Sequence, residues 1–417
     1  MRIGFFTDSY RPNMNGVVVS IETFAAEIAR LGSSVVVFAP RTEISGFFTQ
    51  RILQSTSSLP PGVEAIFWVP SFPLITERSH GLALPIARRV RQLAEELGLD
   101  VVHTHTPFAI GYVGVQTGRA LGLPLVHTYH TLYAEYSHYL KAGAPLARRI
   151  TPAYSRWFCN LHDRVLAPSH DIHDILAGYG VRRPIEVLMT GVPIPPDSSP
   201  AEQRHARARL GLSRSASVLL FAGRIAREKN LDLLLSALEI LGRRRPEVEL
   251  VIAGDGPDRT RLEHVARDQG IAARVHFIGW VPHTEMDSCY RAADVFVSAS
   301  VTETQGLALL EAMAAGAPVV AARGPGVVDL IETETDGLLV APAAEPFAAA
   351  VERILADPEL GRQLGAAARR RAEHLDAGRQ ARLLIDRYEE LRTSARGGRR
   401  GLRGLAARAR EEVAAWR

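Results

Sequence analysis

The feature that most constrains the fold is a repeated alternation of short apolar runs with amphipathic segments. The first half of the chain contains the runs RIGFF, SVVVFAP, EAIFWV, DVVHTH, PLVHTY, RVLAPS and PIEVLM. Several are apolar on both faces, as parallel strands buried between two layers must be. Amphipathic segments such as Val17–Leu31 and Leu82–Leu97 lie between them and indicate helices. This alternation predicts a parallel β-sheet with helices on both faces.

A second α/β domain follows a break in this pattern. The segment GVPIPPDSSPAEQ, residues 191–203, is rich in proline and serine and is typical of an interdomain linker. The alternation then restarts with the runs SVLLFAG, VELVIAG, RVHFIG, DVFVSAS, APVVAA and DGLLVAP. A chain of 417 residues is also too long for one compact core. We therefore expect two doubly wound domains that face each other across a cleft, with ligands at the carboxyl ends of the strands.

Composition excludes several classes of protein. The net charge of +4 is too small to indicate a nucleic-acid-binding protein by itself. Two distant cysteines, Cys159 and Cys289, exclude a disulfide framework and favour a reducing cytoplasm. The start MRIGFFTDSY does not resemble a signal peptide, and no apolar run reaches membrane-spanning length. The arginine-rich end, residues 395–417, is either a solvated tail or a basic surface-binding segment.

Two cations follow the first strand of the second domain. The segment FAGRIAREKN places Arg224 and Lys229 between a strand and the start of a helix. A diphosphate is bound by this combination of positive charge and helix-terminal N–H groups. The alternative is a charged surface turn without a ligand.

The next two strands end in turns that could approach a ligand closely. Gly254, in IAGDGPDR, permits a tight turn, but Arg259 occupies the last glycine position of G-x-G-x-x-G. This departure disfavours a dinucleotide-dependent oxidoreductase. After the following strand, the backbone at Trp280 and Val281 could pair with the edge of a nucleobase. A plain strand end is the alternative there.

The segment SVTETQGLALLEAMAAG places two glutamates on either side of a glycine. Glu303 precedes a helix that we expect to begin at Gly306 and Leu307, where backbone amides could face a phosphate. Glu311 lies in the second turn among apolar residues. A buried carboxylate is costly without donors, and the vicinal hydroxyls of a ribose would supply them.

Together these segments resemble the retaining glycosyltransferases of family 4. The resemblance rests on GRIAREKN followed by ETQGLALLEAMAAG, where Glu303 and Glu311 match the Glu-x7-Glu signature and Arg224 and Lys229 match the preceding cation pair. It implies the GT-B fold, a nucleotide-activated sugar as donor and retention of the anomeric configuration. It also implies that Arg224, Lys229, Glu303 and a histidine are the catalytic residues.

The first domain carries matching features. The resemblance places Gly16, in DSYRPNMNGV, beside the donor diphosphate, and His130, in VHTYHTLY, beside the sugar and the acceptor. His127 is expected to pack in the core. His103 and His105 share a strand, but no carboxylate or cysteine cluster completes a metal site. The chain also lacks Asp-x-Asp, so we expect no metal cofactor.

The acceptor is indicated by aromatic and basic residues of the first domain. The pattern YHTLYxxYxHY is similar to that of bacterial diacylglycerol glucosyltransferases, which suggests UDP-glucose as donor and a lipid acceptor. A core stripe of helically spaced tyrosines is the alternative. Arginines on two amphipathic segments would bind an anionic membrane surface, which implies a peripheral location at the inner face of the membrane. The residues in question are Tyr129, Tyr133, Tyr136 and Tyr139, then Arg88, Arg89, Arg91, Arg148, Arg149, Arg156 and Trp157.

Other functions remain as alternatives. The acceptor could be a phosphatidylinositol-type lipid or a soluble sugar, and a hydrolysing sugar-nucleotide epimerase would share the architecture. A non-catalytic sugar-nucleotide-binding protein and a nucleic-acid-binding protein are disfavoured. We expect the first domain over residues 1–195, the second over 196–375, a helix over 376–394 that packs back on the first domain, and a basic tail over 395–417.

Overall fold

The structure is a computed structural model that divides into two compact units. It describes residues 1–12, 14–41, 52–55, 59–74, 77–83, 87–134, 144–197, 199–213 and 215–395. The first unit comprises Met1–Pro168, His173–Leu188 and the described part of Gly378–Arg417, and the second comprises Ser169–Ile172 and Met189–Ala377. Each unit is described by itself. The arginine-rich tail, Tyr136 and Tyr139 lie outside the described residues.

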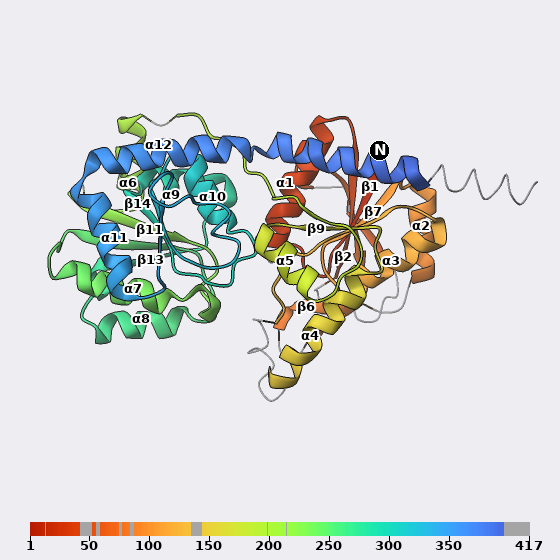
Figure 1. Cartoon of the computed structure of the whole chain (residues 1–417), viewed down its shortest axis with the longest axis horizontal. Coiled ribbons are helices and arrows are strands. Elements are labelled where there is room, and N and C mark those ends of the chain that lie inside the picture. Colours follow the sequence, from red (N-terminus) through yellow and green to blue (C-terminus); the bar gives the residue numbers. More distant parts are fainter. Residues whose placement is uncertain are drawn as a thin grey trace, which may run out of the picture. The chain divides into compact units, whose positions relative to one another are not determined.

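The first unit is built on an eight-stranded sheet (Figure 1). All neighbouring strands are parallel except β3, which runs antiparallel to β4 at one edge. In spatial order the strands are β10 (Ile185–Val187), β9 (Arg164–Ala167), β8 (Leu125–Thr128), β7 (Val101–Thr104), β1 (Arg2–Phe6), β2 (Ser34–Pro40), β4 (Val63–Val69) and β3 (Leu53–Ser55). A separate antiparallel pair is formed by β5 (Ser71–Leu74) and β6 (Glu77–Ala83).

Alternate residues of the central strands enter two separate cores. In β1, Ile3 and Phe5 join one apolar cluster and Phe6 joins the other; Val37 and Phe38 of β2 divide in the same way. Successive strand side chains point to opposite faces, so a strand that is apolar throughout needs helices on both sides. One face is covered by α1 (Gly16–Arg30) and a final helix over residues 377–395, and the other by α2 (Ala87–Glu96) and α3 (Ala109–Leu121).

One expectation for the first unit is corrected. The segment expected as a helix from Leu82 begins as strand, because Leu82 belongs to β6 and α2 starts only at Ala87, two residues after Pro85. Proline is accommodated at the beginning of a helix but not inside it. The unit also contains α4 (Ala144–Cys159) and α5 (His170–Gly178), which lead into β9 and β10.

The second unit is a six-stranded, fully parallel sheet with helices on both faces (Figure 1). Its strands in spatial order are β13 (Val275–Gly279), β12 (Val248–Ala253), β11 (Ser217–Ala222), β14 (Val295–Ser298), β15 (Val319–Ala322) and β16 (Leu338–Val340). Its helices are α6 (Pro200–Arg209), α7 (Leu231–Gly242), α8 (Arg259–Asp268), α9 (Met286–Ala292), α10 (Leu307–Ala314), α11 (Ala344–Ala356) and α12 (Pro358–His374), with short 3-10 turns η3 (Arg227–Lys229), η4 (Ala272–Arg274) and η5 (His283–Glu285). The runs read as strands in the sequence thus form two Rossmann-like sheets, as predicted.

The expected linker is shorter than its composition suggests. Pro200 already begins α6, because Ser199 caps the helix and exchanges hydrogen bonds with Glu202 in a capping box. Earlier in the linker, the N–H of Val192 donates to the carbonyl of Leu375 at 3.1 Å, and the N–H of Ala377 donates to the carbonyl of Val192 at 3.1 Å. The first linker residues therefore run alongside the segment that leads into the final helix.

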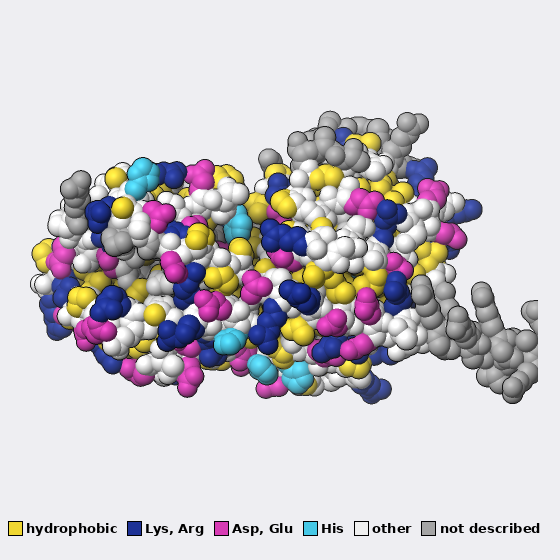
Figure 2. All heavy atoms as spheres, turned by 90° about the horizontal axis from the view of Figure 1, so that it is seen from above, with side chains coloured by type: hydrophobic (Ala, Val, Ile, Leu, Met, Phe, Trp, Pro, Cys, Tyr) yellow, Lys and Arg dark blue, Asp and Glu magenta, His cyan; other side chains and the backbone are white. Residues whose placement is uncertain are grey.

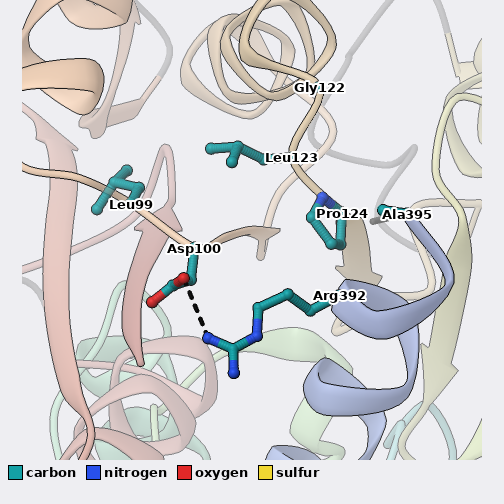
Figure 3. A pocket seen from close by; sticks show the side chains of 7 residues that line it. All are labelled: Leu99, Asp100, Gly122, Leu123, Pro124, Arg392 and Ala395. Carbon is teal, nitrogen blue, oxygen red and sulfur yellow. Dashed lines mark hydrogen bonds and ion pairs between the residues drawn. The ribbon is translucent and has the colours of Figure 1, made fainter. Parts of the chain in front are cut away.

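The final helix belongs to the core of the first unit. Ala381, Leu384 and Tyr388 are fully buried in the same cluster as Ile3 and Phe5. Near the end of the helix, Arg392 donates to Asp100 at 3.1 Å beside a small hollow lined by Leu99, Gly122, Leu123, Pro124 and Ala395 (Figure 3).

Among the described residues, no helix is both long enough and apolar enough to span a membrane. The face drawn in Figure 2 carries dark-blue Lys and Arg side chains interspersed with magenta Asp and Glu side chains. That face therefore presents mixed charge instead of a field of one sign.

Candidate active site

The ends of three neighbouring strands in the second unit pack directly on one another through glycine. Gly254, just after β12, donates its N–H to the carbonyl of Gly279 at 2.8 Å. Its φ is +146°, and a Cβ there would lie 1.9 Å from the carbonyl oxygen of Gly223. Glycine is therefore required at position 254 by the packing of the loops themselves.

The predicted cations lie in the loop after β11. Arg224 is exposed and directly follows Gly223. Lys229 ends the 3-10 turn η3, and Asn230, with φ of +52°, leads into α7. Lys229 therefore lies in a separate 3-10 turn before α7, whereas the sequence suggested that Lys229 lies at the start of the helix.

Lys229 and Glu303 form the centre of the site in this unit. The ammonium of Lys229 donates to the Glu303 carboxylate at 2.6 Å, and the two side chains retain 22% and 19% of their exposure. Burial opposes ionisation of Glu303, but the charge and hydrogen bonds of Lys229, helped by Ser300, outweigh it and hold the pKa of Glu303 below its ordinary value. Glu303 is therefore a carboxylate at neutral pH, partly shielded yet accessible to a ligand.

Gln305 fixes the loop that carries Glu303. Its side-chain oxygen accepts the N–H of Thr190 at 2.8 Å, and its side-chain nitrogen donates to the carbonyl of Thr190 at 2.6 Å. Gly326 packs against this loop so closely that a Cβ there would lie 2.5 Å from the carbonyl carbon of Thr304. Neither residue was predicted from sequence, because both contacts join segments that no local sequence pattern brings together.

Gly306 converts this loop into helix α10. Its φ of +82° lies in the left-handed region, and the helix starts at Leu307 without a side-chain cap. The first amides of a helix have no acceptor within the helix, so they can bind an anion. The predicted positions of Gly306 and Leu307 at a helix start are confirmed.

Glu311 is held by two residues that sequence reasoning missed. The hydroxyl of Tyr290 donates to Glu311 at 2.5 Å, and Nδ1 of His283 lies 3.8 Å from its other oxygen. Burial raises the pKa of Glu311 above its ordinary value, and His283 and Tyr290 only partly offset this. The sequence pointed to ribose hydroxyls as the donors to Glu311, whereas in the structure the hydroxyl of Tyr290 supplies one donor from the same unit.

Trp280 and Val281 follow β13 at the same sheet edge. Trp280 is 61% exposed, whereas Val281 is half-buried against the apolar cluster that contains Leu309. Gly279 takes a φ of +77° before them. A large exposed aromatic ring beside a glycine turn is available for a flat ligand.

The first unit places Gly16 at the first position of α1. The side chain of Asn15 accepts the N–H groups of Val17 and Val18 at 3.0 and 3.2 Å, and its amide donates to Ser9 at 2.7 Å. Asn15 is thus the N-cap of α1, and the exposed Gly16 is the first residue of the helix.

His130 is half-buried and lies against the fully buried His105. Its Nε2 is 3.0 Å from Nδ1 of His105, and the two rings stack with centroids 5.3 Å apart. Burial, followed by the proximity of His127, lowers the pKa of His130 to about 3. His103 contacts the hydroxyl of Tyr388 at 2.6 Å and Thr128 at 2.8 Å. His130 is therefore a neutral imidazole at physiological pH.

Of the tyrosines after β8, the two that the structure describes, Tyr129 and Tyr133, do not lie on a helix. Tyr129 and Tyr133 lie in a loop and turn, and their rings meet edge to face with centroids 5.7 Å apart. The hydroxyl of Tyr129 hydrogen-bonds Ser155 at 2.9 Å. Their helical spacing was therefore coincidental, because the chain leaves β8 directly into a turn.

An exposed aromatic patch lies on α3 and α4. We define it as Phe108, Tyr112, Tyr154 and Trp157, which are 37–47% exposed. Trp157 lies 5.9 Å from the ring of Tyr112 and 5.5 Å from that of Tyr154, measured between ring centroids. Phe108 is the residue before α3, in the segment that follows β7.

A search of the described residues finds no group of three or more His, Cys, Asp or Glu side chains placed to hold a metal ion. His103 and His105 stack on each other with ring centroids 4.2 Å apart and are fully buried. His127 bonds Thr104 at 2.9 Å within the core.

Comparison with known proteins identifies the family. Residues 14–194 match the profile of Glycosyltransferase Family 4, and residues 202–371 match that of Glycosyl transferases group 1. The chain is 32% identical to an alpha-monoglucosyldiacylglycerol synthase of Streptococcus pneumoniae over 86% of this chain and 80% of that protein. It is also 32% identical to a GDP-mannose-dependent alpha-mannosyltransferase of Mycolicibacterium smegmatis over 89% of this chain and 92% of that protein.

Solved structures have the same fold at lower identity. Sucrose-phosphate synthase from Thermosynechococcus elongatus superposes with a TM-score of 0.77 at 23% identity, over 94% of this chain and 100% of that chain. Anabaena HepE in complex with UDP superposes with a TM-score of 0.74 at 21% identity, again over 94% and 100% of the two chains. The two Rossmann-like units are thus those of the GT-B fold, and this chain belongs to glycosyltransferase family 4.

Proposed function

We propose that this protein transfers a hexose, with retention of configuration, from a nucleotide sugar to a membrane lipid. UDP-glucose is the proposed donor and a 1,2-diacylglycerol the proposed acceptor. The observation that carries the proposal is the 2.6 Å pair of Lys229 and Glu303 beside the uncapped start of α10. This pair brings a cation and a carboxylate from two loops next to the free amides of a helix start, a combination suited to a sugar and a diphosphate.

The donor diphosphate is proposed to bind the cations and the helix start. Negative charge grows on the diphosphate as the glycosidic bond breaks, so fixed positive charge lowers the barrier most in the transition state. Arg224, Lys229 and the amides at Gly306 and Leu307 would supply it. The glycine at position 254 would shape the floor of this site.

The sugar and nucleoside are proposed to bind the glutamates. Glu303 would accept hydrogen bonds from hexose hydroxyls, and its low pKa keeps it ionised for this task. Glu311 would accept ribose hydroxyls with the oxygen that Tyr290 leaves available, while Trp280 and the backbone of Val281 would contact the base. These assignments are residue roles of our proposal.

His130 is proposed to bind a hydroxyl of the sugar or acceptor. With a pKa of about 3 it cannot act as a cationic acid near neutrality, but a neutral imidazole can donate or accept one hydrogen bond. No residue is assigned as a covalent nucleophile. The proposed reaction is attack from the face that the diphosphate leaves, with no metal ion taking part.

A lipid acceptor is favoured by the aromatic patch and by the relatives. Two alpha-monoglucosyldiacylglycerol synthases are 32% and 30% identical to this chain. Phe108 and Tyr133 also pack edge to face, with centroids 5.3 Å apart, after two strands of the first sheet. Exposed aromatic rings next to arginines are suited to the membrane interface, so we propose a peripheral location at the cytoplasmic membrane face.

The decisive experiment is a donor and acceptor matrix. Purified protein is incubated with labelled UDP-glucose or GDP-mannose and with diacylglycerol, phosphatidylinositol or a soluble sugar in mixed micelles, and the anomeric proton of each product is read by NMR. A glucosyl lipid with the donor's configuration supports the proposal. Release of free sugar or an epimer without transfer to any acceptor would contradict it.

A mannosyl transfer is the second candidate. It is favoured by the GDP-mannose-dependent alpha-mannosyltransferase, which has the same 32% identity to this chain as the alpha-monoglucosyldiacylglycerol synthase. The match covers 92% of the length of that mannosyltransferase. The same matrix separates the two donors. Thermal shifts give an earlier indication, because the nucleotide that binds raises the melting temperature by mass action.

A further inference from the structure

A cluster of arginines surrounds a hollow in the first unit that the proposed sugar transfer does not use. The hollow has a volume of about 600 Å³ and is lined by Arg156, Asn160, Arg182 and Arg183. Arg156 lies in the last turn of α4, and Arg182 and Arg183 precede β10. We refer to this group as the arginine hollow.

The arginine hollow lies at the amino end of the sheet. Asn160 comes just before β9, and Arg182 and Arg183 come just before the parallel neighbour β10. His130 and Gly16, in contrast, follow the carboxyl ends of β8 and β1. Since neighbouring strands are parallel, the arginine hollow lies at the amino ends of the strands, and His130 and Gly16 lie at the opposite, carboxyl ends of the same sheet.

The backbone and side chain of Asn160 hold the arginines in place. Its side-chain oxygen accepts the N–H of Arg182 at 2.8 Å, and its carbonyl accepts Nε of Arg183 at 3.3 Å. Arg156 lies across Gly180, where a Cβ would come 3.3 Å from Arg156 Cδ. The side chains are thus gathered around one space by the turns that join α4 to β9 and α5 to β10.

None of these three arginines pairs with a carboxylate among the residues that the structure describes. Other arginines of the same unit do: Arg2 pairs with Glu64 at 2.8 Å, and Arg392 pairs with Asp100 at 3.1 Å. Three positive charges gathered without a counter-charge repel one another, and a bound anion removes that repulsion.

We propose that the arginine hollow binds a phosphate ester. Guanidinium groups match phosphate oxygens in a bidentate manner, and three of them suit a dianion. Among the described residues, the lining consists of three guanidinium groups and one amide, which favours phosphate and hydroxyl groups over an apolar or aromatic ring. The ligand is therefore a small phosphorylated polyol, either free in solution or as the headgroup of an anionic lipid.

The test compares two double variants, each of which lowers the net charge of the protein by two. Arg182→Gln with Arg183→Gln removes two arginines of the hollow, while Arg204→Gln with Arg370→Gln removes two exposed arginines of the second unit. Binding of glycerol 3-phosphate is measured by equilibrium dialysis. Partition into vesicles of phosphatidylcholine with phosphatidylglycerol is measured by sedimentation.

We expect the hollow variant to lose at least about tenfold in affinity for one of these probes, because each charge-assisted hydrogen bond contributes roughly that factor. Loss with glycerol 3-phosphate identifies a soluble ligand, and loss with vesicles alone identifies a lipid headgroup. Equal binding of both probes by the hollow variant and the wild type overturns the proposal.

Two further variants separate this site from the donor site and from misfolding. Lys229→Ala should leave glycerol 3-phosphate binding unchanged, and loss of binding in that variant instead would place the anion in the donor loop. Arg156→Gln leaves both contacts of Asn160 intact and should still weaken binding. Neither measurement depends on sugar transfer, so the proposal can fail while the proposed function stands.

Discussion

The ammonium of Lys229 lies 2.6 Å from the carboxylate of Glu303, although 74 residues separate them in the sequence. Lys229 therefore has two tasks in our proposal: it keeps Glu303 ionised, and it offers its remaining N–H groups to the departing diphosphate.

Replacement of Lys229 should impair the chemical step. We expect Lys229→Ala to lower kcat/KM by roughly 2–4 kcal/mol of transition-state stabilisation, as the loss of comparable electrostatic groups does. Arg227→Ala is the matched control, because Arg227 is an exposed cation on the same 3-10 turn. Steady-state kinetics with the identified donor measures both variants. A Lys229→Ala enzyme with unchanged kcat/KM would rule out the diphosphate assignment.

Glu311→Gln should separate stability from donor binding. The folded-state pKa of Glu311 lies above its ordinary value of 4.5, so the folded protein binds more protons than the unfolded chain just above that pH. Stability from this group is thus present at low pH and lost as pH rises through the raised pKa. Glutamine removes that loss, so the melting temperature at pH 7.5 should rise or stay equal while the donor KM increases about tenfold.

The pH dependence of this variant provides its control. The difference in melting temperature between Glu311→Gln and wild type should shrink as the pH falls below 4.5, where the wild-type carboxyl becomes protonated in both the folded and the unfolded state. Tyr290→Phe should raise the donor KM without the gain in stability. A Glu311→Gln variant that melts earlier at every pH would show that the carboxylate mainly supports the fold.

The buried histidines should make the first unit sensitive to acid. Burial lowers the pKa of His130 to about 3 and that of His127 to about 4, so the folded state binds fewer protons than the unfolded chain below pH 6.5. Stability from these groups is therefore complete above pH 6.5 and is lost as pH falls. Urea unfolding at pH 7 and pH 5 should show the loss, and His130→Gln should reduce it. Equal stability at both pH values would contradict the assignment of neutral, buried rings.

The aromatic patch should bind membranes. Trp157→Ala is expected to reduce partition into diacylglycerol-containing anionic vesicles by about tenfold, since full burial of a large apolar side chain contributes about 1.5–3 kcal/mol. Leu383→Ala, on the exposed side of the final helix, is the matched apolar control. If the Trp157→Ala and Leu383→Ala variants sediment with the vesicles to the same extent, the aromatic patch is not part of the membrane-binding surface.

Removal of metal ions should leave the reaction intact. The proposed charge stabilisation comes from Arg224, Lys229 and helix amides, so treatment with EDTA should change the initial rate by less than about twofold. Dialysis against EDTA followed by assay, with and without added Mg²⁺, measures this. If EDTA lowers the rate and Mg²⁺ restores it, a metal ion takes part in stabilising the charge, and the proposal that Arg224, Lys229 and helix amides do so alone is wrong.

The sequence predicted the strands well because most of them are buried on both faces. Runs such as SVVVFAP leave no other arrangement for so many apolar side chains in succession. The strands β3, β5 and β6 were missed, since short edge elements such as LQS carry no comparable apolar pattern. The start of α10 was predicted because Gly306 has a local signature that does not depend on distant residues.

Contacts between distant residues could not be predicted in the same way. Tyr290 reaches Glu311 from α9, and Gln305 binds Thr190 across more than a hundred residues. No periodicity in the sequence encodes such pairs, because they depend on how separate elements pack. The spacing of Tyr129 and Tyr133 was actively misleading, since a turn and a helix can place tyrosines at the same interval.

The final helix has a consequence for the order in which the protein is made. Ala381, Leu384 and Tyr388 complete a core whose other members, such as Ile3 and Val37, are synthesised first. Domains usually fold as they leave the ribosome, at about 5–20 residues per second. Here one face of the nascent first unit is covered by α1 alone throughout translation of the whole second unit. A ribosome that stops before Tyr388 thus releases a chain whose apolar sheet is partly exposed, and such a chain is a substrate for chaperones and proteases.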